Sequence, residues 1–153
     1  MDYPSWFDKL KIPSDCITKK SSAKEQQSSF AIQPAPNDQI WRVKVDGCWL
    51  QDKDGRKVDY LFWGQSQTHW QVTLLVELKG RDYGSALQQI EATLLRLGQH
   101  YEGALQAHVI LSKGTGVPLR QREVERLRKV YKIRVYPHTI RFECKHLDAL
   151  KSK

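Results

Sequence analysis

The segment from residue 40 to residue 78 constrains the fold most, because its apolar residues recur with the period of β-strands. Residues 40–45 alternate apolar and basic side chains, and residues 57–63 alternate again. This period of two is typical of strands with one face buried. Residues 70–78 contain the uninterrupted apolar run Val72–Val76, which is typical of a central strand covered on both faces. We therefore expect three consecutive antiparallel strands, a β-meander.

A helical repeat follows the meander. Asp82 or Ser85 is suited to cap the start of this helix, and Gly98 is suited to end it. Its apolar residues fall at helical spacing and are Tyr83, Ala86, Leu87, Ile90, Leu94 and Leu97.

Beyond this helix, residues 105–111 are expected to return to strand. A second, basic helix is expected from Leu119 to about Tyr131, with Val124, Leu127 and Tyr131 facing inward. Two short strands, 133–136 and 139–144, are predicted around a turn at Pro137–His138. The fold class is therefore α/β, a mixed β-sheet with helices packed on it.

The first 38 residues differ from the rest. Residues 21–29 are polar and show no period, and residues 34–38 are typical of a linker. Trp6, Phe7, Leu10 and Ile12 are suited to dock on the body or on a partner, and fraying is the alternative. We expect an N-terminal arm and linker over 1–38 and a single domain over 39–153.

Composition limits the class of protein. The chain has 153 residues, of which 40% are hydrophobic and 27% are charged, as in a soluble globular domain. We expect neither a secretory signal in residues 1–20 nor a membrane span, since about 18 consecutive apolar residues are missing. The cysteines Cys16, Cys48 and Cys144 are few, widely spaced and odd in number, which predicts reduced thiols and a cytoplasmic location.

The positive charge is concentrated. The formal net charge is +8, and residues 113–134 hold eight basic against two acidic residues. Such clustering favours nucleic acid as a partner, and a solvated face is the alternative. The residues of the second helix expected to contact phosphates are Arg120, Arg122, Arg126, Arg128 and Lys129, and Lys132 extends this face.

Two carboxylates and one ammonium group are predicted to share one sheet surface. Glu77 and Lys79 are two residues apart in one strand and therefore point to the same face. Asp59 lies on the preceding strand, where the hairpin places it beside Glu77. Two close carboxylates are suited to bind a divalent cation, of which Mg²⁺ fits best. The alternative is an ordinary salt-bridge patch.

These residues carry a resemblance to a family. The segments 57–62, 75–80 and 86–93, read as KVDYLF, LVELKG and ALQQIEAT, resemble the PD-(D/E)xK (restriction-endonuclease-like) nuclease superfamily, and small prokaryotic members in particular. The similarity covers about residues 40–112, with a continuation to Cys144. It implies an α-β-β-β-α-β core. The proline that gives the family its name is replaced here by Val58.

The resemblance also implies roles. Asp59 and Glu77 would bind Mg²⁺ (Mn²⁺ is possible), with the Leu78 carbonyl as a further ligand. Lys79 would hold the attacking water or stabilise charge on the phosphate. Gln89, on the flank of the helix, would assist, whereas its neighbour Gln88 points away. An acidic residue on a preceding helix is not assigned, which leaves the use of one or two metals open.

The sequence therefore predicts a Mg²⁺-dependent nuclease that hydrolyses phosphodiester bonds, in DNA more than in RNA. The first alternative is a module of the same fold that binds nucleic acid or a protein without cutting. The second is a structural subunit whose tryptophans form an interface. A homodimer is possible, because a double-strand cut needs two sites.

Overall fold

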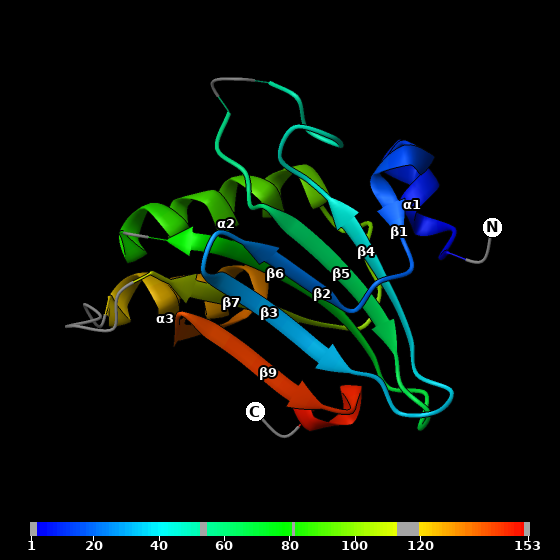
Figure 1. Cartoon of the computed structure of the whole chain (residues 1–153). Coiled ribbons are helices and arrows are strands. Elements are labelled where there is room, and N and C mark those ends of the chain that lie inside the picture. The colour runs from blue at the N-terminus through cyan, green and yellow to red at the C-terminus, as the bar shows by residue number, and fades with distance from the viewer. Residues whose placement is uncertain (1–2, 53–54, 81, 113–119, 152–153) are drawn as a thin grey trace.

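The computed structural model describes residues 3–52, 55–80, 82–112 and 120–151. It is a mixed α/β structure with a six-stranded main sheet and a smaller three-stranded second sheet (Figure 1). The helices are α1 (Trp6–Lys9), α2 (Tyr83–Leu97) and α3 (Gln121–Tyr131), with the 3₁₀ helices η1 (Ser14–Cys16) and η2 (Leu147–Leu150). The strands are β1 (Ile17–Thr18), β2 (Ser22–Glu25), β3 (Ser28–Gln33), β4 (Gln39–Lys44), β5 (Tyr60–Gln65), β6 (Gln71–Gly80), β7 (Ala104–Leu111), β8 (Arg134–Thr139) and β9 (Arg141–Lys145).

The main sheet has the strand order β1-β4-β5-β6-β7-β8. Strands β4, β5 and β6 are antiparallel neighbours, which confirms the predicted meander. Strands β7 and β8 then join in parallel. Each parallel step needs a crossover, and α2 and α3 provide these crossovers. The expected mixed sheet with packed helices is confirmed.

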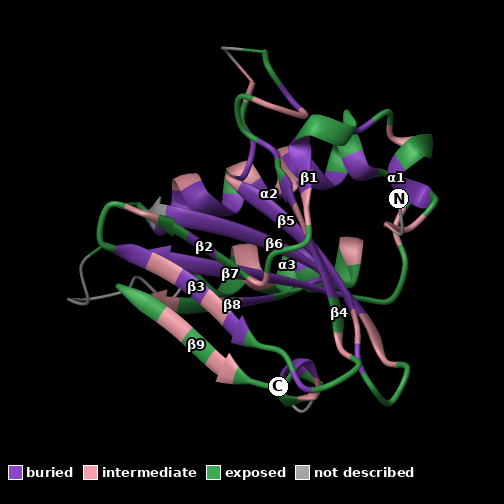
Figure 2. Cartoon of the chain, turned by 45° about the vertical axis from the view of Figure 1, so that its right-hand side comes forward, coloured by how far each residue is buried: buried purple, intermediate pink, exposed green. Residues whose placement is uncertain are grey.

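Both faces of β6 are buried, as its apolar run predicts. Leu75 belongs to the core on the helix side, with Leu87 and Ile90 of α2. Leu74 and Val76 belong to the core on the other side, which the second sheet covers. Figure 2 shows the central strands buried along their length between these two layers, whereas β9 lies at the surface. The site described below therefore lies on the central one of three packed layers.

Helix α2 follows the sequence prediction closely. Asp82 is its N-cap, and its carboxylate accepts a hydrogen bond of 2.9 Å from the Gly84 amide. Gly98 follows the last turn with a φ of 59°, a conformation that favours glycine. All six apolar residues predicted for the inner face are buried. The helix is therefore capped at both ends. It begins at Tyr83, shortly after β6 ends at Gly80.

The predicted arm and linker contains regular structure. Strand β1 extends the main sheet by pairing with β4. Strand β2 pairs with β3, and β3 pairs in parallel with β9 near the other end of the chain. The sequence gives little sign of this sheet, because the buried apolar residues Ala23, Phe30 and Ile32 are separated by polar ones. Trp6, Phe7 and Ile12 are buried in the helix-side core, which confirms docking on the body.

A disulfide joins Cys16 and Cys48, with Cα atoms 5.7 Å apart. The prediction of reduced thiols is therefore wrong for these two cysteines, and Cys144 is a free thiol. The pairing of β1 with β4 brings η1 next to the turn after β4, and a sequence separation of 32 residues gives no sign of this. The bond attaches the N-terminal segment to the β4–β5 connection.

The C-terminal strands differ from expectation. Strand β8 runs through Pro137 and His138, so the predicted turn there is wrong. Pro137 lies on the edge strand of the main sheet, where a missing N–H donor is tolerated. The chain instead turns at Ile140, whose φ is 66°, and β9 crosses to the second sheet. Among the described residues, no helix has the length and apolar character to cross a membrane.

Candidate active site

The structure brings Asp59 and Glu77 together. Tyr60 of β5 is paired with Val76 of β6, so the residue before β5 lies beside Glu77. The Asp59 amide donates a hydrogen bond of 3.2 Å to Glu77 Oε1. The amide of Leu78 donates one of 2.7 Å to Asp59 Oδ2. The predicted juxtaposition of the two carboxylates is therefore present, and it is fixed by backbone hydrogen bonds.

Glu77 is buried, with 7% of its surface exposed. Its pKa is raised from 4.5 to about 9, mainly by burial, and further by the charge of Asp59 and a hydrogen bond to the Asp59 side chain. A buried carboxylate next to a second carboxylate is costly to ionise. Glu77 therefore holds a proton at neutral pH until something compensates its charge.

Lys57, two residues before Asp59 in the sequence, binds other groups. Lys57 is buried, and its Nζ donates to the carbonyl oxygens of Asp52 and Gly55. It lies 3.9 Å from Asp46. Asp46 itself adds to the raised pKa of Glu77. Asp59 and Asp46 therefore both oppose ionisation of Glu77.

An irregularity in β6 coincides with the predicted motif. The register with β7 shifts between Glu77 and Gly80, as in the β-bulges that often lie next to active sites. The Leu78 side chain faces the opposite core, and its amide is held by Asp59. Lys79 lies in β6, and its side chain is outside the described residues.

Helix α2 is joined to the site by Thr93. The Val58 amide donates a hydrogen bond of 3.0 Å to Thr93 Oγ1, and this hydroxyl donates to the Gln89 carbonyl at 2.9 Å. Gln89 is half-buried and Gln88 is exposed, as their positions on the helix predict. Sequence reasoning missed Thr93, although a threonine within an apolar stripe was a signal for it. Asp46 was also missed, and no pattern marks it.

The donor set fits a magnesium ion. Mg²⁺ keeps several waters and binds through one or two carboxylates together with substrate phosphates, and Asp59 and Glu77 supply such a pair. Among the described residues, no group of three or more His, Cys, Asp or Glu side chains is suited to hold a metal.

The five basic residues predicted for nucleic-acid binding differ in their surroundings. Arg120 lies 2.9 Å from Glu123, Arg126 binds Glu91 of α2 through two hydrogen bonds, and Arg128 pairs with Glu125. Arg122 and Lys129 form no ion pair with any residue of the described ranges. Three of the five cations are therefore paired with carboxylates, and the contact of these residues with phosphates stays a prediction.

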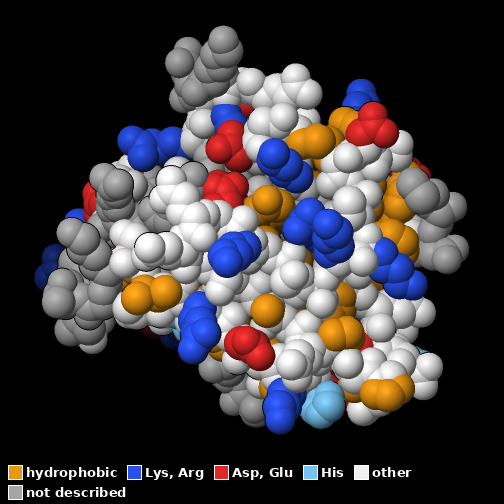
Figure 3. Space-filling view, viewed as in Figure 1, with side chains coloured by type: hydrophobic (Ala, Val, Ile, Leu, Met, Phe, Trp, Pro, Cys, Tyr) orange, Lys and Arg blue, Asp and Glu red, His pale blue; other side chains and the backbone are white. Residues whose placement is uncertain are grey.

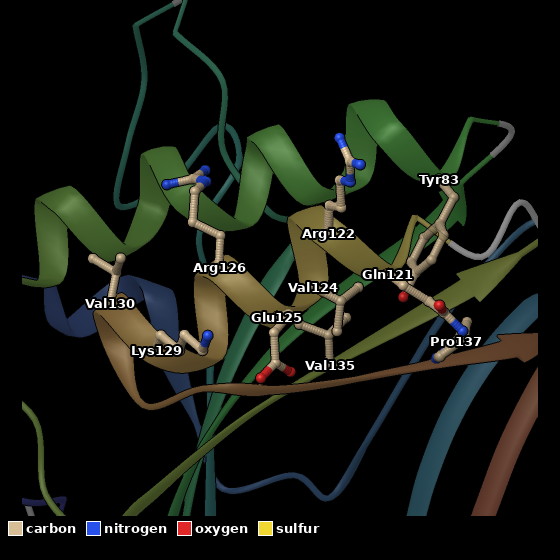
Figure 4. A pocket seen from close by; sticks show the side chains of 10 residues that line it. All are labelled: Tyr83, Gln121, Arg122, Val124, Glu125, Arg126, Lys129, Val130, Val135 and Pro137. Carbon is tan, nitrogen blue, oxygen red and sulfur yellow. The ribbon is translucent and has the colours of Figure 1, made fainter.

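The two unpaired cations line a groove of about 870 Å³ beside α3 and β8. Figure 4 shows that its side chains come from α3, from β8 and from the start of α2. Val124, Val130 and Val135 give much of its wall an apolar character. The groove therefore combines two free cations with an aliphatic surface.

Comparisons with other proteins give no assignment for this site. No family model, curated protein or solved structure matches the chain.

Proposed function

We propose that this chain is a Mg²⁺-dependent nuclease whose active site is built around Asp59 and Glu77. One observation carries the proposal: a buried glutamate is held against a second carboxylate by hydrogen bonds from the backbone amides of Asp59 and Leu78. Carboxyl groups with strongly perturbed pKa values cluster at functional sites.

Asp59 and Glu77 would hold the cation. Glu77 releases its proton when the cation is present, because a positive charge reverses the balance that keeps it protonated. A bound Mg²⁺ supplies polarisation of a phosphodiester oxygen and a bound water of lowered pKa. By resemblance, Lys79 holds the attacking water or stabilises charge on the phosphate, and Gln89 assists.

The order of elements supports the same proposal. The segment β4-β5-β6-α2-β7, with β6 and β7 parallel, is consistent with the core that the resemblance implies. In addition, Glu77 lies near the carboxyl end of β6, where ligands of parallel sheets commonly bind. The expected nucleic-acid substrate is DNA rather than RNA.

A cleavage assay tests the proposal. Supercoiled plasmid, single-stranded DNA, branched DNA and RNA are incubated with the protein and Mg²⁺ or Mn²⁺, with a chelator as control. We expect cutting that needs metal and is reduced at least about a hundredfold in Glu77→Gln, since one essential electrostatic group typically contributes that much.

Two controls sharpen the result. Asp59→Asn keeps an oxygen that can accept from the Leu78 amide and should also be inactive. Gln88→Ala changes an exposed residue of the same helix and should retain full activity. Metal-dependent cutting that persists in both Glu77→Gln and Asp59→Asn would contradict the proposal. Binding without cutting on every substrate would favour a non-catalytic module.

A further inference from the structure

Cations that no carboxylate neutralises are the ones best suited to bind the nucleic-acid backbone. Each phosphate that such a cation neutralises releases counterions from the nucleic acid. Three of the cations of α3 and its start are paired, as described above. Lys24 of β2 and Arg141 of β9 are both exposed, and neither forms an ion pair within the residues that the structure describes. The second sheet therefore offers free positive charge that the sequence analysis did not assign.

Lys24 and Arg141 lie in one row across the second sheet. Lys24 is paired with Ser29 of β3, and Ser29 is paired with Arg141. Neighbouring strands are about 4.8 Å apart, so the two cations flank the serine over roughly 10 Å. Figure 3 views this side of the molecule and shows Lys and Arg side chains spread over it, with fewer acidic ones.

A hollow of about 600 Å³ opens at this row. We name it the Lys24–Arg141 hollow. Among the residues that the structure describes, no acidic side chain lines it. Besides the two cations it is lined by the amides and hydroxyls of Gln26, Gln27, Ser29 and Thr139, and by Ile140. Ammonium, guanidinium, amide and hydroxyl groups all donate hydrogen bonds, and this is the set of donors that a phosphate requires.

The hollow and the carboxylate pair lie toward the same ends of the strands, on opposite faces of the main sheet. Gly80 of β6 is paired with Leu111 of β7, and Leu111 is paired with Thr139 of β8. Thr139 lines the hollow, so the hollow begins two strand spacings, roughly 10 Å, from the end of β6. Glu77 is three residues before Gly80, on the helix side of the sheet.

We infer that the Lys24–Arg141 hollow binds a backbone phosphate of the nucleic-acid substrate, a short distance along the strand from the phosphate that is cleaved. The inference rests on the proposed function, because it makes the hollow a second contact for the same substrate. A strand that passes over the carboxyl ends of β6, β7 and β8 contacts both places. The second sheet therefore fixes where the substrate lies relative to Asp59 and Glu77.

The salt dependence of binding tests this. Fluorescence anisotropy measures binding of a labelled DNA of about 20 nucleotides, single-stranded or duplex, in chelator and at several salt concentrations. In Lys24→Gln/Arg141→Gln, the slope of log K against log salt should fall by about 1.4 for the single strand and about 1.8 for the duplex, because two phosphate contacts are lost. Circular dichroism confirms folding.

The matched control is Lys9→Gln/Lys11→Gln, which removes the same charge from two exposed residues at and just after α1. Its slope should equal that of the unchanged protein. A slope that falls in this control and not in the Lys24/Arg141 variant would overturn the inference, as would a wild-type protein that binds neither DNA. If the slope of log K against log salt falls in Lys24→Gln/Arg141→Gln while the wild type cuts no substrate, the proposed function fails and the phosphate site stands.

Discussion

Replacing Glu77 by glutamine should make the folded protein more stable at neutral and alkaline pH. The buried Glu77 carboxyl keeps its proton up to a pKa of about 9, whereas its ordinary pKa is 4.5. The folded chain therefore binds more protons than the unfolded chain between these values, and stability decreases as the pH rises through this window. Glutamine is neutral throughout and can accept from the Asp59 amide.

The size of the effect follows from the width of this window. Each pH unit within it corresponds to about 1.4 kcal/mol. As the pH rises from about 5 to about 8, the free energy of unfolding of the wild type should therefore fall by on the order of 4 kcal/mol because of Glu77. In Glu77→Gln this decrease should be absent, so the variant should be the more stable protein at pH 8.

Urea denaturation across this pH range, in chelator, measures the free energy of unfolding of both proteins. Glu91→Gln is a control of opposite sign, because hydrogen bonding to Arg126 lowers the pKa of Glu91, so this variant should lose stability at neutral pH and not at acid pH. Equal pH slopes in wild type and Glu77→Gln, or a less stable Glu77→Gln at pH 8, would refute the reasoning.

Three further predictions concern the frame of the site. Cys16→Ser should lower the free energy of unfolding by about 4 kcal/mol, from the loop entropy of a 32-residue separation; urea melts with and without reductant check this, and a reductant-insensitive wild type would contradict it. Thr93→Val leaves the buried Val58 amide without its partner and should cost about 1–3 kcal/mol, measured by thermal melting against Thr93→Ser, which keeps the hydroxyl. Asp82→Ala removes the N-cap of α2 and should cost about 1 kcal/mol; an unchanged melting temperature would argue against the cap.

The meander, α2 and the carboxylate pair were predictable because they depend on local patterns. Alternation marks β4 and β5, and the apolar run marks β6. A hairpin between neighbouring strands then fixes which residues face each other, so Asp59 and Glu77 meet without information from distant segments. The helix signals at Asp82 and Gly98 have equally local causes.

The second sheet was not predictable in this way. Strand β3 pairs with β9, more than a hundred residues later, and the inward residues Phe30 and Ile32 are only two positions in a polar segment. The disulfide and the ion pair between Arg126 and Glu91 likewise depend on contacts between distant elements. Charge counted along the sequence therefore did not show which cations of α3 are paired with carboxylates.

Binding of Mn²⁺ to the chain is the most direct test of the central claim, that Asp59 and Glu77 form a cation site. Electron paramagnetic resonance measures free Mn²⁺ during titration into the wild type, Asp59→Asn and Glu77→Gln at about pH 8, and calorimetry in buffers of different ionisation enthalpy measures the protons released. We expect Mn²⁺ to bind the wild type with release of a proton from Glu77, and binding to be lost in both variants. Binding of equal strength in all three proteins, or no binding to the wild type even with DNA present, would contradict the account.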